Sequence, residues 1–366
     1  MKRIIICCDG TWNRIDQLDR IPPRPGDDVP EQPESVPAPT NVAKFAMAVV
    51  RKGDDHISQE VYYQRGVGTS QLHRVRGGAF GLGLLGNVQR AYRFLVDLYE
   101  PGDEIFLLGF SRGAYTVRAL AGLIRNCGIL KQRYAAEEAS NVLRFYLRRL
   151  PRTTPDAPSA LLLRKTYSND TRIKFVGVWD TVGALGIPMG PLRSLRRGMI
   201  FHDTYLSMNV ENAFHALAID EQRRPFVPAL WLQQARAVGQ RLEQVWFCGV
   251  HSNIGGGYAD TGLSDITLVW MINRAVECGL RIDKAEVWPA ITPDPFGAIR
   301  DSMTIPYKLL ALRRVRPICE SWTGGRSREV LHPSVMERWE EMQDYRPLNL
   351  MGLLGRTGGA PALSQE

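Results

Sequence analysis

Ser111, Asp180 and His251 carry side chains that can attack an electrophilic carbon or move protons, and each follows a short apolar run. Ser111 is the centre of a G-x-S-x-G sequence, residues 109–113. A serine on a tight strand-to-helix turn presents its hydroxyl clear of the sheet, where it can act as a nucleophile. The motif alone is weak, because glycine and serine are common in loops, and an ordinary turn is the alternative. The strand signal before it and the helical spacing after it favour the nucleophile.

Asp180 and His251 come after the serine in the chain order Ser, Asp, His that is typical of α/β-hydrolases. The carboxylate of Asp180 would hold the imidazole tautomer, and His251 would take the serine proton and return it to the leaving group. The alternatives are a turn-capping role for Asp180 and a structural role for His251. Asp260 is a second candidate for the acid, and His332, which precedes a proline, is a second candidate for the base.

Backbone amides are the expected donors to a developing oxyanion. Arg112 begins the helix after the serine, so its amide is one candidate. Gly10 and Thr11 follow the first apolar run of the chain and are the candidates for a second donor. Asp9, in the same exit loop, is a candidate supporting residue, or it merely closes the turn.

His215 is another candidate supporting residue, although a lone histidine is more often structural. Its segment, residues 212–220, reads as a helix. Metal assistance is an alternative that ranks low, because Asp9, Asp180 and His251 show no metal-ligand spacing. We expect neither a metal nor a cofactor.

Strands and helices alternate along the chain, which predicts an α/β fold of the α/β-hydrolase type. We expect a mostly parallel central sheet with helices on both faces and with cap or loop insertions. The ligand site of such a sheet lies beyond the carboxyl ends of its strands. The predicted strands are residues 4–8, 60–67, 105–108, 173–179 and 244–250, and the predicted helices include residues 42–50, 87–99, 266–278 and 330–338.

The spacing of these signals indicates one catalytic domain over residues 1–350 and a flexible tail over residues 351–366. A proline-rich loop occupies residues 22–40. Residues 132–165 and 183–205 are candidate cap or lid insertions, with ordinary packing as the alternative. Residues 81–86 match the G-x-G-x-x-G fingerprint nominally, but no strand precedes them, so a dinucleotide site is not expected.

The composition is that of an ordinary soluble globular protein, with 44% hydrophobic and 23% charged residues in a chain of 366. No apolar run is long enough to span a bilayer, and the N-terminus does not read as a signal peptide. The six cysteines form no C-x-x-C pair, which suits synthesis in the reducing cytoplasm. Arginines are spread along the chain, so the net charge of +8 does not indicate nucleic acid. Residues 183–200 mix Leu, Ile and Met with arginines, which suits peripheral contact with anionic lipid.

Five short segments together are similar to one known family. The segments are CDGTWN at residues 8–13, GFSRGA at 109–114, VWDTVG at 178–183, HALAIDE at 215–221 and VHSNIGGGY at 250–258. They resemble the uncharacterised α/β-hydrolase domain family that includes the phospholipase effectors of type VI secretion. The resemblance implies a serine hydrolase with Ser111, Asp180 and His251 as its triad, a glycerophospholipid acyl ester as one substrate, and export without a signal peptide.

The leading hypothesis is therefore hydrolysis of carboxylic esters, of phospholipids or other lipid esters, through a Ser-His-Asp triad. A small-ester or thioester hydrolase would use the same chemistry in a different pocket. A catalytically silent module that keeps the fold and binds a partner or a membrane is the contrasting alternative.

Overall fold

A central parallel sheet organises the molecule, which we describe from a computed structural model. The structure describes residues 1–10, 13, 16–20, 35–66, 79–148, 150–182, 204–283, 285, 288–303, 308, 313–319, 326–359 and 361–364. Seven strands pair in the order β11-β10-β9-β8-β5-β1-β4, and every neighbouring pair is parallel. In that order the strands are Glu329–Leu331, Arg241–Phe247, Val210–Ala218, Ile173–Trp179, Glu104–Phe110, Arg3–Cys8 and Gln59–Gln64.

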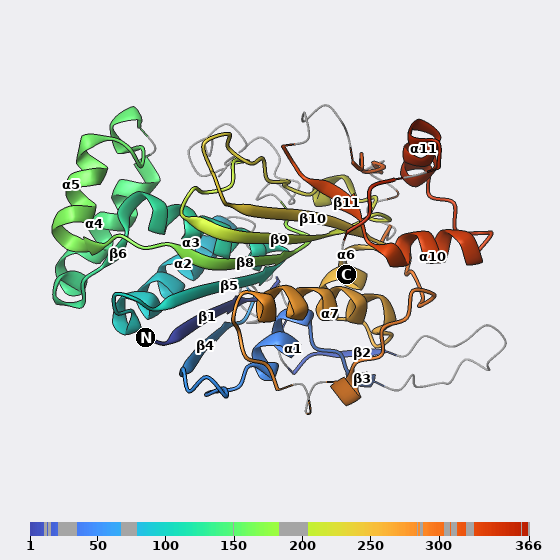
Figure 1. Ribbon diagram of the computed structural model, residues 1–366, viewed down its shortest axis with the longest axis horizontal. Helices are drawn as coiled ribbons and strands as arrows, with labels where there is room; N and C mark the ends of the chain where they lie inside the picture. The colour runs from blue at the N-terminus through green and yellow to red at the C-terminus, as the bar shows by residue number, and fades with distance from the viewer. Residues whose placement is uncertain are drawn as a thin grey trace.

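Helices cover both faces of this sheet, as the sequence predicts (Figure 1). On one face lie α1 (Asn41–Ala48) and α7 (Gly262–Glu277), and on the other lie α2 (Ala79–Leu98) and α3 (Arg112–Cys127). Because successive side chains of a strand point to opposite faces, β1 is apolar throughout its centre. Ile5 packs in the core beneath α1 and α7, whereas Ile4 and Ile6 pack beneath α2 and α3. The α/β fold is thus confirmed.

The two glycines of the G-x-S-x-G sequence allow β1, β5 and α3 to approach closely. A Cβ on Gly113 would lie 2.0 Å from the carbonyl oxygen of Cys8, at the end of β1. A Cβ on Gly109 would lie 2.6 Å from the backbone nitrogen of Ala114. Since backbone atoms cannot yield to such contacts, any side chain at these positions would move α3 away from the sheet.

The segment that carries His215 was predicted as a helix, and this prediction is wrong. Residues Val210–Ala218 form β9, which pairs in parallel with β8 and β10. Alanine, glutamate and leucine favour helices in isolation, but burial between two strands overrides that preference. His215 is therefore a buried strand residue, fully enclosed in the sheet.

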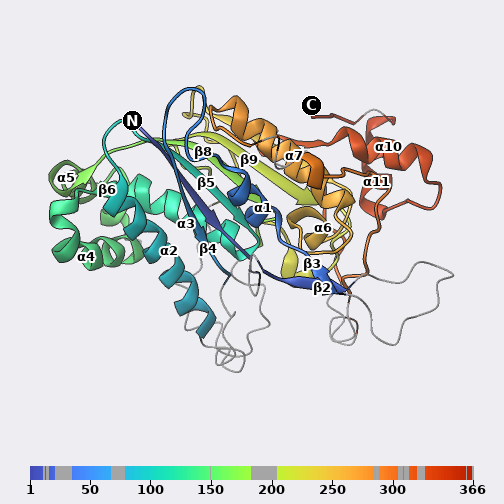
Figure 2. The same cartoon turned by 90° about the horizontal axis from the view of Figure 1, so that it is seen from below.

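Residues 132–165, a candidate cap with ordinary packing as the alternative, do not cover the carboxyl edge of the sheet. They form α4 (Ala135–Arg148) and α5 (Pro158–Tyr167), joined to the body by the short strands β6 (Ile129–Leu130) and β7 (Ser168–Asn169). Figures 1 and 2 both place α4 and α5 at the end of the molecule opposite α6 (His251–Gly255). The reason is that α3 runs antiparallel to the strands, so the chain leaves it at the amino edge.

Several predicted irregular segments contain regular structure. β2 (Leu18–Arg20), just before the proline-rich region, pairs antiparallel with β3 (Ser35–Pro37) inside it, while residues 21–34 lie outside the described residues. The glycine-rich residues 81–86 belong to α2, which begins earlier than predicted. The second lid candidate, residues 183–205, lies outside the described residues except for its last two positions.

The C-terminal segment is more ordered than the predicted flexible tail. It contains α11 (Leu348–Thr357), which follows α10 (Pro333–Glu341). The Leu331 amide donates to Ala362 O at 2.9 Å, and the Ser364 amide donates to Leu331 O at 2.8 Å. The tail therefore extends the edge of the sheet beside β11. Among the described residues, no helix combines the length and apolarity needed to cross a bilayer.

Candidate active site

Ser111 occupies a strained turn between β5 and α3. Its backbone φ is +56°, a left-handed value that is uncommon for residues other than glycine. The side chain makes no capping hydrogen bond to the first turn of α3, unlike most serines at that position. The Ser111 amide donates to Trp179 O at 3.0 Å, which ties the turn to the end of β8. Ser111 thus occupies a strained strand-to-helix turn, and its role as a nucleophile stays a prediction.

Asp180 and His251 are in direct contact. Asp180 follows β8 and His251 begins α6, just beyond β10, so both lie at the carboxyl edge of the sheet. Asp180 Oδ2 is 2.5 Å from His251 Nδ1, and both side chains are buried. An imidazole that donates from Nδ1 to a carboxylate presents Nε2 as an acceptor. Parallel strands of one sheet thus bring together residues that are distant in the sequence.

Arg316 is a second partner of Asp180 that the sequence did not reveal. Its Nη1 lies 2.7 Å from Asp180 Oδ1 and its Nη2 lies 3.0 Å from Asp180 Oδ2. Burial alone would raise the pKa of Asp180, but the charge of Arg316 and the bond to His251 hold that pKa well below its usual range. The chain contains many arginines, and nothing in the local sequence distinguishes this one. Only the tertiary structure identifies it.

The His251 ring lies between two aromatic side chains, Phe110 and Phe226. The ring centroids are 4.6 Å and 5.0 Å apart, respectively. Phe110 directly precedes Ser111, so the contact brings the serine turn next to the imidazole. Burial lowers the pKa of His251, and the bond to Asp180 only partly opposes that effect. This shift favours the neutral form of the His251 ring.

Glu221 supports the backbone of His251 rather than its ring. Its Oε2 accepts from the His251 amide at 3.3 Å, and its two oxygens pair with Arg223. Burial would raise the pKa of Glu221, but Arg223 keeps it below its ordinary value. The guanidinium of Arg223 also lies 3.6 Å from the centroid of Phe226. Glu221 and Arg223 thus form an ion pair that contacts both the backbone of His251 and the Phe226 ring that packs on it.

The three amides proposed for the oxyanion have different surroundings. The Gly10 amide donates to Asp9 Oδ1 at 2.7 Å, and this bond occupies it, so the expectation for Gly10 is not met. Gly10 nevertheless adjoins the serine, because a Cβ there would lie 3.3 Å from Ser111 Cβ. Thr11 lies outside the described residues. Arg112 is the first residue of α3, where amides have no acceptor within the helix.

Asp9 shapes this loop through three hydrogen bonds. Besides the Gly10 amide, it accepts from Tyr63 Oη at 2.6 Å and from Thr40 Oγ1 at 2.8 Å. Burial raises the pKa of Asp9 to about 6, although these bonds oppose the shift. The pKa of Asp9 therefore lies close to the ordinary pKa of a histidine side chain.

His215 supports the turn that carries Asp180. Its Nε2 accepts from the Thr181 amide at 3.1 Å, and its Nδ1 lies 3.2 Å from Gln244 Oε1. Burial lowers the pKa of His215 to about 3, so the ring stays neutral and can accept that bond. His215 therefore lies next to the turn that follows β8, through its bond to Thr181.

The two alternative residues from the sequence take other partners. Asp260 accepts from the amides of Gly262 and Ala298, at 3.2 Å and 3.0 Å, and so joins the start of α7 to a loop. His332 Nδ1 lies 2.8 Å from Ser334 Oγ, and the ring stacks on Phe247. Burial lowers the pKa of His332 to about 4. The structure brings neither residue to Ser111.

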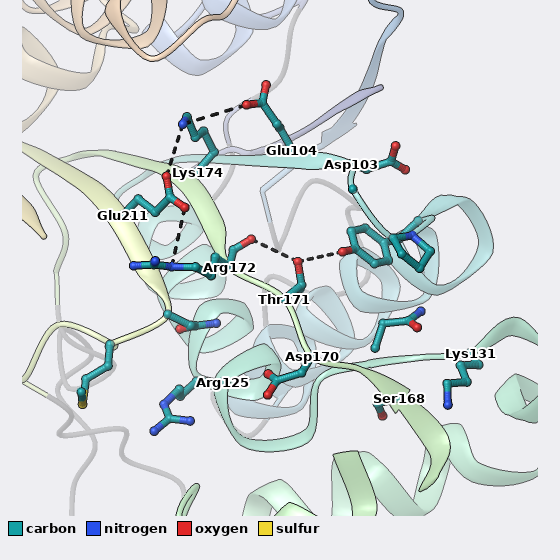
Figure 3. A pocket seen from close by; sticks show the side chains of 16 residues that line it. Asp103, Glu104, Arg125, Lys131, Ser168, Asp170, Thr171, Arg172, Lys174 and Glu211 are labelled. Carbon is teal, nitrogen blue, oxygen red and sulfur yellow. Dashed lines mark hydrogen bonds and ion pairs between the residues drawn. The ribbon is translucent and has the colours of Figure 1, made fainter. Parts of the chain in front are cut away.

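A pocket of about 900 Å³ opens at the opposite, amino edge of the sheet (Figure 3). Glu104, Arg172, Lys174 and Glu211 pair with one another along its lining. Lys174 lies between Glu211, at 3.3 Å, and Glu104, at 4.0 Å, and Glu211 also contacts Arg172. This pocket contains none of the candidate catalytic residues. Within the described ranges, His, Cys, Asp and Glu side chains form no group of three that could hold a metal ion.

Comparisons with known proteins place the chain in a family. The catalytic-domain profile of the T6SS phospholipase effector Tle1-like family matches residues 2–274. The uncharacterized protein YEL023C of Saccharomyces cerevisiae is 29% identical over 247 residues, which are 62% of this chain and 32% of that protein.

Two solved structures are also similar, each at 18% identity. An uncharacterized protein from Pseudomonas aeruginosa aligns over 80% of this chain and 49% of its own, with a TM-score of 0.43. The Tle1 effector bound to the VgrG spike of the type 6 secretion system aligns over 72% of this chain and 52% of its own, with a TM-score of 0.36. The chain thus spans about half of these two proteins and a third of the yeast relative. On the match over residues 2–274, it belongs to the Tle1-like phospholipase effector family, in the catalytic domain of that family.

Proposed function

We propose that this chain hydrolyses carboxylic esters of phospholipids or related lipids through Ser111, His251 and Asp180. The observation that carries the proposal is the 2.5 Å contact between Asp180 and His251 at the carboxyl edge, next to the strained Ser111 turn. The family description, which names phospholipases, favours a lipid ester as the substrate.

In the proposed reaction, Ser111 Oγ attacks the acyl carbon while His251 Nε2 accepts the hydroxyl proton. The alkoxide leaving group departs with a proton from His251, and water then cleaves the acyl-enzyme by the same route. Asp180 keeps the Nδ1 proton of His251 in place and stabilises the imidazolium. The Arg112 amide, aided by the dipole of α3, is our proposed donor to the oxyanion.

A fluorophosphonate probe tests this proposal directly, because it reacts with activated serines. We expect labelling of the folded chain at Ser111, identified by mass spectrometry of the modified peptide. Absence of labelling in folded protein would instead favour the catalytically silent alternative. Turnover of phosphatidylethanolamine–phosphatidylglycerol vesicles should then exceed turnover of p-nitrophenyl butyrate. The reverse preference would favour the small-ester or thioester hydrolase.

The pH dependence of kcat/KM should have an acid limb set by the Asp180–His251 pair. Since burial lowers the pKa of His251, activity should persist to a lower pH than an ordinary histidine base allows. As the pH falls through that pKa, the protonated ring can no longer accept the Ser111 proton. Asp9, with a pKa of about 6, is the competing source of an inflection. If the acid limb of the kcat/KM profile persists in Asp9→Asn, the Asp180–His251 pair causes it. If the limb disappears, titration of Asp9 causes it.

We also propose delivery by type VI secretion, without a signal peptide, and peripheral contact with a lipid surface. The family description names effectors of that system. An epitope-tagged chain should reach the culture medium of a producing strain only while the secretion system is intact.

A further inference from the structure

Arg316 is almost entirely enclosed at the centre of the candidate site. It lies in the described segment 313–319, which is neither helix nor strand, and is 1% exposed. Besides the two bonds to Asp180, its Nη1 donates to Ala218 O at 2.9 Å and its Nη2 donates to Phe226 O. The guanidinium is thus anchored both at the end of β9 and beside the ring that packs on His251.

Hydrogen bonds to both oxygens of Asp180 fix the orientation of its carboxylate, which one partner on one oxygen could not do. Oδ1 accepts from Arg316 and from the Ala218 amide at 3.2 Å, whereas Oδ2 accepts from Arg316 and His251. A planar guanidinium that pairs with both oxygens fixes the plane of the carboxylate. The direction of the Oδ2 lone pair determines where the Nδ1–H of His251 can point, so this plane also sets the orientation of the imidazole.

We propose that Arg316 is a positioning residue, which orients the His251 imidazole through Asp180 and limits its protonation. The inference rests on the proposed function and deepens it. Two effects are combined: the paired oxygens hold the geometry, and the cation offsets part of the negative charge that would otherwise favour an imidazolium. The first effect needs the planar fork of arginine, whereas the second needs only a positive charge.

Other charges also face His251 and are left intact by changes at Arg316. Asp180 and Glu221 lie beside it from the ends of β8 and β9, and Arg223 lies behind Phe226. Removing only the Arg316 cation leaves the buried Asp180 carboxylate without its strongest partner. The Asp180–His251 pair would then take up a proton at a higher pH, on the ring or on the carboxylate. Either protonated form is inactive in the proposed reaction.

The test compares Arg316→Lys with Arg316→Met by the rate constant of fluorophosphonate labelling from about pH 5 to pH 8, the range in which imidazole titrates. Lysine keeps the charge but loses the fork. We expect its labelling rate to fall about 100-fold at every pH, the size of effect expected from a small misplacement, with the acid limb unmoved. Methionine keeps the volume without the charge, and its acid limb should move to higher pH.

Arg164→Met is the matched control. Arg164 is also buried and also binds carbonyls, with Nη1 donating to Asn126 O at 2.9 Å and to Pro155 O at 2.8 Å, but it lies near the amino edge. We expect unchanged labelling per folded molecule, with the folded fraction measured by near-UV circular dichroism. If the Arg316 variants lose rate only in proportion to their folded fraction, and the acid limb stays in place, Arg316 is merely structural. If Arg316→Met does not fold, Arg316→Lys alone decides, because an unchanged rate per folded molecule rejects the positioning role.

The two levels of proposal fail differently. If the native chain does not label at Ser111, the proposed function is rejected. If the native chain labels normally while the Arg316 variants behave like Arg164→Met, only the role of Arg316 is rejected.

Discussion

Ser111→Ala should lower kcat/KM for ester hydrolysis by about a million-fold, to the level left by binding and oxyanion stabilisation. The substitution removes one oxygen atom and keeps the Cβ, so the backbone strain at φ +56° is the same in both proteins. The free energy of unfolding should therefore change little. The measurement is product release from phospholipid vesicles by mass spectrometry, together with loss of fluorophosphonate labelling.

Ser334→Ala is the matched control for that experiment. Ser334 is also buried, and its hydroxyl lies 2.8 Å from the imidazole of His332, but the described residues place no carboxylate on that ring. This pair resembles a serine–histidine arrangement without its acid. We expect full activity from Ser334→Ala. If Ser334→Ala loses activity while Ser111→Ala keeps it, Ser334 rather than Ser111 is the nucleophile, and the proposed function is rejected.

Asp180→Asn should reduce both catalysis and stability. The catalytic loss should be about ten-thousand-fold, because an amide cannot hold the required histidine tautomer. The free energy of unfolding should fall by about 3–5 kcal/mol, because the buried Arg316 guanidinium loses its carboxylate partner. Urea denaturation and steady-state kinetics on the same preparation measure the two effects.

A second substitution separates these two effects. Asp180→Asn combined with Arg316→Met removes both buried charges, so much of the lost stability should return while kcat/KM stays low. Asp265→Asn breaks the ion pair between the buried Asp265 and the partly buried Lys44, at 2.7 Å, and Asp265 has no hydrogen bond to His251 or Asp180 among those between described residues. It should lower stability but preserve kcat/KM per folded molecule. Equal catalytic losses in the two aspartate variants would show that Asp180 acts only through folding.

The elements that carry the site were the most predictable part of this protein. The apolar runs before Asp9, Ser111 and Asp180 are all strands of the parallel sheet. A strand buried on both faces must be apolar along its length, and a polar residue that follows it then lies at the sheet edge. That rule uses only the local sequence, so the position of Asp180 and His251 at one edge of the sheet could be predicted without the structure.

The errors arose where long-range contacts override local preference. Residues Val210–Ala218 have the composition of a helix but form a strand, because β8 and β10 satisfy their backbone on both sides. Residues 132–165 were a candidate cap, with ordinary packing as the alternative, and the direction of α3 carries them to the opposite edge. The Gly10 amide is a different case, because a local contact is responsible: this candidate oxyanion donor already donates a hydrogen bond to the side chain of its neighbour Asp9.

The order of apolar runs and polar exit residues along the chain was enough to determine the α/β fold, the strained serine turn and the edge at which the candidate residues meet. It could not determine what surrounds them. Arg316 reaches Asp180, and Glu221 and Phe226 reach His251, from segments outside the strands and α-helices, and these contacts exist only once the sheet has formed. A strand's local pattern dictates which face each side chain takes, whereas the partner of a buried charge depends on which distant segment packs against it.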